Sequence, residues 1–267
     1  MDTYGRLREG MKWMWSLGDY SEVAVRLRPH AEALVAACDI KPGMTVLDVA
    51  AGNGNVAVEA ARRGAEVTAS DLTPSMVEMG RARSAAEGLA ISWLEADAEE
   101  LPLPTRSFDI VTSAFGAIFA PRPGRVAAEL FRVARPGGLV AMANYTSRGF
   151  LAAFADLVSD FATPAPISLP SPFQWGDADV VRRRFDGLAS TIEVRPCMAA
   201  FEFDSTAEAL GFMERTNAGQ LALRSLLPEA RYREVQERSE RLMREQNGAS
   251  DGRTVLEFEY LIVLARA

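Results

Sequence analysis

The stretch Val46-Leu-Asp-Val-Ala-Ala-Gly-Asn-Gly-Asn55 decides the fold. It lies in a short β-branched and apolar run, residues 44–50, of the kind that forms a buried strand. Gly52 and Gly54 follow at a turn from strand to helix, where the backbone must approach a ligand closely and a Cβ atom would obstruct it. The turn leads into a helix N-terminus, whose free amides favour an anionic or polar ligand. We therefore expect a strand–turn–helix unit that binds a ligand at its turn.

The same alternation of strand and helix continues along the chain. Further strands are predicted at 65–70, about 91–95, 108–113 and 139–145, and helices at 56–63, 73–87 and about 124–135. Short connections between strands and helices are typical of a parallel sheet covered on both faces. The predicted fold class is α/β, with a doubly wound, Rossmann-like sheet. Ligands of such sheets bind outside the carboxyl ends of the strands.

The segments on either side of this core have a different pattern. Residues 1–38 are predicted to be helical, and residues 146–250 are mixed. For the mixed segment we expect helices at 148–161, 177–185, 205–217 and 228–247, a proline-rich loop after the first of these, and a strand at 190–203. A last strand is expected at 254–265.

Composition excludes several classes of protein. The 267 residues are 48% hydrophobic and 24% charged, which is typical of a globular chain with one main core. The net charge of −7 disfavours a nucleic-acid partner. A single histidine, His30, and two distant cysteines, Cys38 and Cys197, disfavour a metal site. No apolar run is long enough for a membrane span and the N-terminus lacks a signal-peptide pattern, so we expect a cytoplasmic protein. The excess of arginine over lysine and the many alanines suggest a GC-rich bacterial genome.

Two acidic residues are positioned to bind a nucleoside through hydrogen bonds. Asp71 ends the second predicted strand, seventeen residues after Gly54, where a carboxylate can accept both hydroxyls of a ribose. Asp97 ends the third strand, where an acid can meet the amino group of adenine. Plainer interpretations remain open: Asp71 as a helix cap, Asp97 as a surface turn, and Asp48 as a residue that only holds the loop through backbone amides.

Five segments, in order, resemble the motifs of class I S-adenosylmethionine-dependent methyltransferases. Besides the opening stretch they are Ser70-Asp-Leu-Thr-Pro-Ser-Met76, Glu95-Ala-Asp-Ala-Glu-Glu-Leu-Pro-Leu-Pro104, Phe108-Asp-Ile-Val-Thr-Ser-Ala-Phe115 and Glu129-Leu-Phe-Arg-Val-Ala-Arg-Pro-Gly-Gly138. The chain is most similar to the group of ubiquinone/menaquinone-biosynthesis methyltransferases. The resemblance covers about 44–145, and Glu257 to Leu264 resembles the strand that enters this sheet antiparallel.

The resemblance implies a cofactor, S-adenosyl-L-methionine, with S-adenosyl-L-homocysteine as product, and a set of residues that hold it. Asp48 and the turn Ala50–Gly54 would face its methionine part, and Asp71 its ribose. Leu72 and Met76 would lie beside the adenine, and Asp97 would receive the adenine amino group. The whole expected set is Tyr20, Asp48, Ala50, Gly52, Asn53, Gly54, Asp71, Leu72, Met76, Asp97, Ala98 and Ala114.

One residue departs from the family pattern. The commonest turn has three glycines, and the first is replaced here by Ala50, which we expect to be compatible with the turn if its φ is negative. The family also suggests a division of the chain. We expect a helical N-terminal lid at 1–38, a cofactor-binding core at 39–145, substrate-cap segments with one core strand at 146–250, and the last core strand at 251–267. The acceptor cavity should be mostly apolar and built from 1–38, 115–120 and 146–250.

The expected reaction is methyl transfer to a small, largely apolar metabolite, for example a quinone, polyketide, indole or terpenoid of secondary metabolism. Its nucleophile can be oxygen, nitrogen or carbon. Alignment can carry most of this catalysis. Candidates for a general base are His30, which follows Pro29 at an expected helix start, Asp19 and Tyr145. No nucleic acid, membrane or metal partner is expected, and a homodimer is left open.

Two alternatives remain open at this stage. The segment Gly52-x-Gly54-x-x-Ala57 also fits a dinucleotide fingerprint, which would indicate a nicotinamide-dependent oxidoreductase. Such reductases usually need a Tyr-x-x-x-Lys pair, and this chain offers only Lys12 and Lys41 as lysines. The second alternative is a protein that binds S-adenosylmethionine on the same fold but catalyses another reaction.

Overall fold

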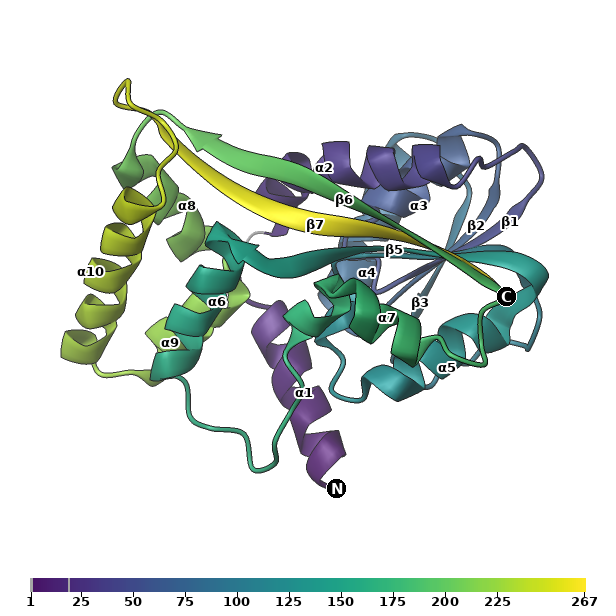
Figure 1. Ribbon diagram of the computed structural model, residues 1–267, viewed down its shortest axis with the longest axis horizontal. Helices are drawn as coiled ribbons and strands as arrows, with labels where there is room; N and C mark the ends of the chain where they lie inside the picture. Colours follow the sequence, from purple (N-terminus) through teal and green to yellow (C-terminus); the bar gives the residue numbers. More distant parts are fainter. Residues whose placement is uncertain (1, 19) are drawn as a thin grey trace.

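The computed structural model describes residues 2–18 and 20–267. In this part of the chain seven strands form one sheet in the order β3-β2-β1-β4-β5-β7-β6 (Figure 1). Every pair from β3 to β5 is parallel, and β7 runs antiparallel to both β5 and β6. The strands are β1 Thr45–Val49, β2 Glu66–Asp71, β3 Ile91–Glu95, β4 Phe108–Ala114, β5 Ala134–Gly149, β6 Thr191–Phe203 and β7 Thr254–Arg266.

Helices cover both faces of this sheet because the central strands are apolar on both sides. One face packs against α2, α3 and α4 through residues such as Leu34 and Ala57. The other face packs against α5 and α7 through residues such as Leu130 and Val181. The bounds of these helices are α2 Tyr20–Ala37, α3 Asn55–Arg62, α4 Pro74–Ala86, α5 Pro123–Val133 and α7 Ala178–Arg184.

The strands β5, β6 and β7 are much longer than the others and extend beyond them. β6 pairs with β7 from Thr191 to Phe203, whereas β5 and β7 pair continuously only up to Tyr145. The protruding ribbon leads to a group of helices at the left of Figure 1. These are α6 Phe150–Phe161, α8 Thr206–Thr216, α9 Ala218–Leu226 and α10 Glu229–Glu245. α1, Thr3–Trp15, lies below the sheet between this group and the core (Figure 1).

The predicted fold class is confirmed, with several local corrections. α9 was not predicted; it follows α8 directly because the Asn217 side chain accepts a hydrogen bond from the Gln220 amide, 2.9 Å long, and caps a new helix. β5 is longer at both ends than predicted. His30 and Pro29 lie inside α2 rather than at its start. Two 3₁₀ helices, η1 Ala117–Phe119 and η2 Pro172–Gly176, were also not predicted.

No helix in the described residues is both long and apolar enough to cross a bilayer.

Replacing two helical glycines by alanine should change the free energy of unfolding in opposite directions. A Cβ atom at Gly80 in α4 would lie 2.1 Å from the buried indole of Trp93, whereas one at Gly10 in α1 would meet nothing within 4 Å. We expect Gly80→Ala to lower the free energy of unfolding by about 1–3 kcal/mol through overpacking. Gly10→Ala should raise it by about 0.5–1 kcal/mol, because alanine restricts the unfolded chain. Urea denaturation measures both, and shifts of the same sign would contradict this packing.

Candidate functional site

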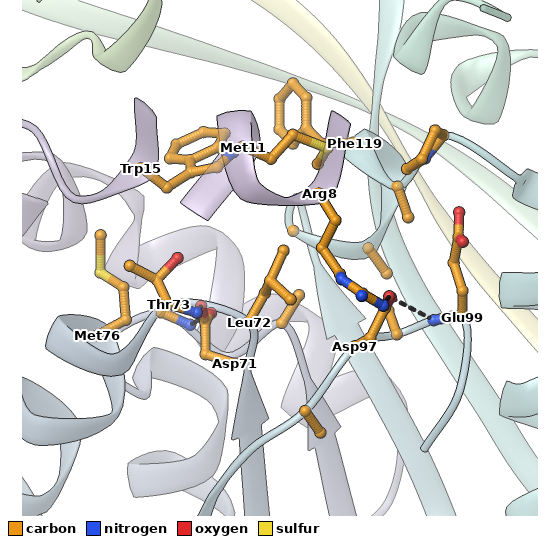
Figure 2. A pocket seen from close by; sticks show the side chains of 18 of the residues that line it. Arg8, Met11, Trp15, Asp71, Leu72, Thr73, Met76, Asp97, Glu99 and Phe119 are labelled. Atoms are coloured by element: carbon orange, nitrogen blue, oxygen red, sulfur yellow. Dashed lines mark hydrogen bonds and ion pairs between the residues drawn. The ribbon is translucent and has the colours of Figure 1, made fainter. Parts of the chain in front are cut away.

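A pocket of about 90 Å³ lies at the carboxyl edge of the sheet, beneath α1 (Figure 2). We call it the sheet-edge pocket. Its floor comes from the ends of β1, β2 and β3, its roof from α1, and one wall from the segment after β4. Floor residues include Ala50, Gly52, Asp71, Leu72, Thr73, Met76, Ala96, Asp97 and Ala98; roof residues are Tyr4, Arg8, Met11 and Trp15.

Asp71 holds the turn that forms the floor. Its carboxylate accepts hydrogen bonds from the amides of Gly52, at 2.8 Å, and Thr73, at 2.9 Å, one on each oxygen. The Thr73 hydroxyl and the Leu72 amide also act on this carboxylate. Burial raises the pKa of Asp71, and these hydrogen bonds oppose that rise. Asp71 also lines the pocket, so a ligand bound there can reach its carboxylate.

Asp48 lies deeper, at the end of β1. It accepts hydrogen bonds from the amide of Ala57 and the hydroxyl of Thr112, both 3.1 Å long. Burial raises the pKa of Asp48 to about 7 in spite of these bonds. Asp48 lines a small cavity together with Tyr20, Asn53 and Ala114. A cationic group bound there would stabilise its charged form.

The two strand ends beside the pocket are strained. Ala50 has φ 53° and Phe115 has φ 59°, both in the left-handed region that side chains disfavour by roughly 1–2 kcal/mol. The condition under which alanine was expected to be compatible with this turn, a negative φ, is therefore not met, and Ala50 adopts the turn at a positive φ. Gly116 makes room for this conformation, because a Cβ atom there would lie 2.3 Å from the Ala50 carbonyl oxygen. Strain of this kind concentrates at functional sites.

The sequence suggested a helical lid at 1–38, but not which of its residues face the pocket or which acids they contact. Arg8 forms an ion pair with Asp97 at 3.4 Å, and Lys12 pairs with Glu95. Figure 2 shows Arg8 reaching down from α1 to Asp97. The four roof residues Tyr4, Arg8, Met11 and Trp15 follow the helical spacing i, i+4, i+7, i+11, and this spacing could have revealed a common face but not what the face covers.

A second cavity, of about 230 Å³, adjoins the first, and we call it the apolar cavity. Of its twenty described lining residues, nine are aromatic and none carries a charge. Trp15 and Phe119, whose ring centroids lie 5.1 Å apart, belong to both linings, as do Tyr20 and Phe115. The other walls come from α2, α6, η2, β6, α8 and α9, and from Tyr145 on β5. These include the three segments that the sequence indicated.

Most of the expected site residues come together here, but not all. The sheet-edge pocket includes Tyr20, Ala50, Gly52, Asp71, Leu72, Met76, Asp97 and Ala98, and the small cavity includes Asp48, Asn53 and Ala114. Gly54 lies outside these linings and faces Trp93 instead. His30 is also outside them, among the rings of Phe115, Phe258 and Tyr260, while Tyr145 lines the apolar cavity. Asp19 lies outside the described residues.

Comparison with known proteins agrees with this geometry. Residues 46–138 match the family model described as "Methyltransferase domain". The uncharacterized protein Rv1403c of Mycobacterium tuberculosis is 44% identical over 183 residues, covering 68% of this chain and 67% of that protein. The ubiquinone/menaquinone biosynthesis C-methyltransferase UbiE of Brucella abortus is 44% identical over 118 residues, covering 42% of this chain and 44% of the enzyme.

Solved structures share the fold. A putative methyltransferase (BH2331) from Bacillus halodurans superposes with a TM-score of 0.61 at 22% identity, covering 88% of this chain and 97% of that one. Geranyl diphosphate methyltransferase in complex with S-adenosylmethionine has a TM-score of 0.52 at 19% identity, covering 90% of this chain and 85% of that one.

The chain belongs to the class I S-adenosylmethionine-dependent methyltransferases. It is an S-adenosylmethionine-dependent methyltransferase, and S-adenosylmethionine is its cofactor. The residues present fit this group. The Asp71 carboxylate lines the sheet-edge pocket at the end of β2, and a side chain at Gly52 would collide with Tyr20, so this turn needs a glycine.

The pKa of Asp48 predicts how stability changes with pH. Its folded-state value of about 7 exceeds the ordinary ~3.9 of an unfolded aspartate. Between these two pKa values the native state binds more protons than the unfolded state, so the free energy of unfolding of the wild type falls as the pH rises towards 7. Asp48→Asn lacks this titration. We therefore expect the free energy of unfolding of Asp48→Asn minus that of the wild type to be about 1–3 kcal/mol larger at pH 8 than at pH 5.

Urea unfolding at the two pH values measures this difference. Asp109→Asn is the matched control, because Asp109 lies at the opposite end of the sheet and its pKa is lowered: hydrogen bonds from Thr45 and Arg135 outweigh burial. That control should show no comparable gain from pH 5 to pH 8. A flat difference for Asp48→Asn would contradict the raised pKa.

Proposed function

We propose that the enzyme transfers a methyl group to a small, largely apolar acceptor without permanent charge, bound in the apolar cavity. One observation carries this proposal: the apolar cavity shares Trp15, Tyr20, Phe115 and Phe119 with the sheet-edge pocket. An acceptor in one cavity and a cofactor in the other would therefore contact the same four side chains. The remaining described lining residues are apolar, apart from Tyr145, Thr216 and Asn217.

Charge and size limit the acceptor. Burying an ionised carboxylate or ammonium group without a partner costs several kcal/mol, and no described lining residue could pair with one. The cavity, at about 230 Å³, exceeds the ~150 Å³ that accommodates benzene in an engineered protein core. A substituted aromatic or fused-ring metabolite suits this space, and such compounds include the expected quinones, polyketides, indoles and terpenoids.

In this proposal the chain divides its tasks by segment. Residues 39–145 bind the cofactor and 251–267 complete their sheet, while 1–38 cover both cavities and 146–250 enclose the acceptor. Asp71 holds the ribose, Leu72, Met76 and Ala98 contact the adenine, and Asp48 lies beside the methionine part. The bound cofactor supplies an activated methyl group on its sulfonium. The protein then has to orient the acceptor and exclude water.

A general base has little support among the candidates. Burial raises the pKa of Tyr145 well above its ordinary value, so its hydroxyl stays protonated. His30 lies outside the cavity linings, and Asp19 lies outside the described residues. We therefore propose that catalysis depends on alignment of the acceptor rather than on proton removal by a cavity side chain.

Asp71 should be essential for cofactor binding. Asp71→Ala removes two expected hydrogen bonds from the ribose to a carboxylate, each worth ~1.5–3 kcal/mol. We expect the affinity for S-adenosylhomocysteine to fall at least ~100-fold in isothermal titration. Asp109→Ala, which removes a carboxylate at the opposite end of the sheet, should leave it within about threefold. Unchanged binding by a folded Asp71→Ala variant would refute the ribose assignment.

The apolar cavity can be tested with methyl-labelled S-adenosylmethionine and a panel of aromatic acceptors. We expect label in uncharged acceptors and none in matched quaternary amines. Ala155→Asp places a charge in the lining and should reduce labelling at least ~10-fold, with S-adenosylhomocysteine binding unchanged. Ala153→Asp, on the same helix but outside the lining, is the control. Turnover without label in the product would instead indicate a reaction other than methyl transfer.

A further inference from the structure

Two tyrosine hydroxyls stand out in the apolar cavity. Tyr20 and Tyr145 are the only ionisable side chains among its described lining residues. Of the other polar residues, Thr216 donates to the Phe212 carbonyl at 2.7 Å, and Asn217 caps α9 through its side-chain oxygen. Within residues 2–18 and 20–267, no hydrogen bond joins either tyrosine hydroxyl to another residue. Two hydroxyl donors without a partner among these residues therefore line a largely apolar cavity.

The ring of Tyr145 is held rigidly. It stacks on Phe115 with centroids 4.2 Å apart and planes 15° from parallel. Its backbone pairs with Tyr260 on β7, and Gly176 of η2 packs so closely that a Cβ atom there would lie 2.1 Å from the Tyr145 carbonyl oxygen. A donor fixed in this way can orient a ligand without the entropic cost of ordering a mobile side chain.

Tyr20 stands where the two cavities meet. Its ring lies against the turn after β1, since a Cβ atom at Gly52 would be 2.8 Å from the ring and 3.3 Å from the hydroxyl. The charged groups that act on it are Asp71 and Asp48; burial first and then these carboxylates raise the pKa of Tyr20. Burial and then the neighbouring Tyr20 raise the pKa of Tyr145. Both hydroxyls therefore stay protonated and can donate but cannot accept a proton.

Granting the proposed function, we propose that the acceptor is a phenol or enol whose oxygen binds as an anion to the hydroxyls of Tyr145 and Tyr20. The acceptor is neutral in solution, and on binding its O–H bond breaks, the proton passes to bulk water and the electron pair stays on oxygen. The tyrosines replace the water that would otherwise solvate this oxygen. The positive charge of the bound cofactor balances the anion, which the lining alone could not do.

The charge of the lining favours this class over amines. A neutral amine would become a cation after methyl transfer, and no carboxylate among the described lining residues could stabilise it. Hydroxyl donors, by contrast, stabilise an oxygen anion. Tyr145 then acts as a catalytic residue that touches the acceptor, and it needs no accessible base.

The test uses 4-nitrophenol, whose anion is coloured, as a probe of the bound oxygen. Absorbance titration against pH gives its apparent pKa on wild-type protein saturated with sinefungin, a cationic analogue of the cofactor. We expect this pKa to lie at least about one unit below that of the free probe. Tyr145→Phe should raise it by about one unit and weaken binding of the anion at least ~10-fold.

Tyr260→Phe is the matched control, because Tyr260 packs edge-on against Phe115 but does not line the cavity. It should leave the probe's pKa and affinity unchanged. Titration with S-adenosylhomocysteine checks that Tyr145→Phe is folded and still binds the cofactor product. An unchanged pKa in Tyr145→Phe, or nitrobenzene binding as tightly as 4-nitrophenol to wild type, would overturn the inference.

These outcomes are distinct from a failure of the proposed function. If uncharged rings bind and accept label but show no preference for a hydroxyl, only the oxygen-binding role is wrong. If no uncharged ring binds to the protein saturated with sinefungin and no acceptor is labelled, the apolar cavity is not the acceptor site and both proposals fail.

Discussion

The hydrogen bond from the Gly52 amide to the buried carboxylate of Asp71 is the interaction on which the site depends. It ties the turn after β1 to the end of β2, and the Thr73 amide binds the other oxygen of the same carboxylate. Burying a charge is expensive unless hydrogen bonds compensate for it. Here backbone amides compensate only in part, because the pKa of Asp71 is still raised by burial. The carboxylate also lines the sheet-edge pocket, where a ligand can reach it.

The residues between the two cavities include Phe115, which has a strained backbone. Ala50 and Phe115 end neighbouring strands in left-handed conformations, and the absence of a side chain at Gly116 lets them approach each other. In return the Phe115 ring reaches into all three linings and supports Tyr145. A less strained strand end would point this ring elsewhere, and the wall between the cavities would be lost.

The roof over the sheet-edge pocket is held differently from its floor. The floor belongs to buried strands, whereas α1 is joined to the end of β3 by ion pairs with partly exposed side chains, Arg8–Asp97 and Lys12–Glu95. Such pairs contribute only about 0–1 kcal/mol each and are screened by salt. The pocket thus combines a rigid floor with a weakly held cover. Arg8 also occupies the carboxylate that the sequence assigned to the adenine amino group.

The parallel core, its strand ends and the acidic residues there were predictable from the sequence, because strand periodicity, glycine turns and the order of the five motifs are local properties. The sequence also indicated which segments would enclose the second cavity. How these segments meet depends on the three-dimensional packing: α1 covers Asp97, Tyr145 stacks on Phe115, and Gly54 packs against Trp93 rather than lining the pocket. The tertiary structure also placed Pro29 inside α2 and Ala50 at positive φ. These outcomes depend on packing between residues far apart in the chain, and such packing overrides local preference.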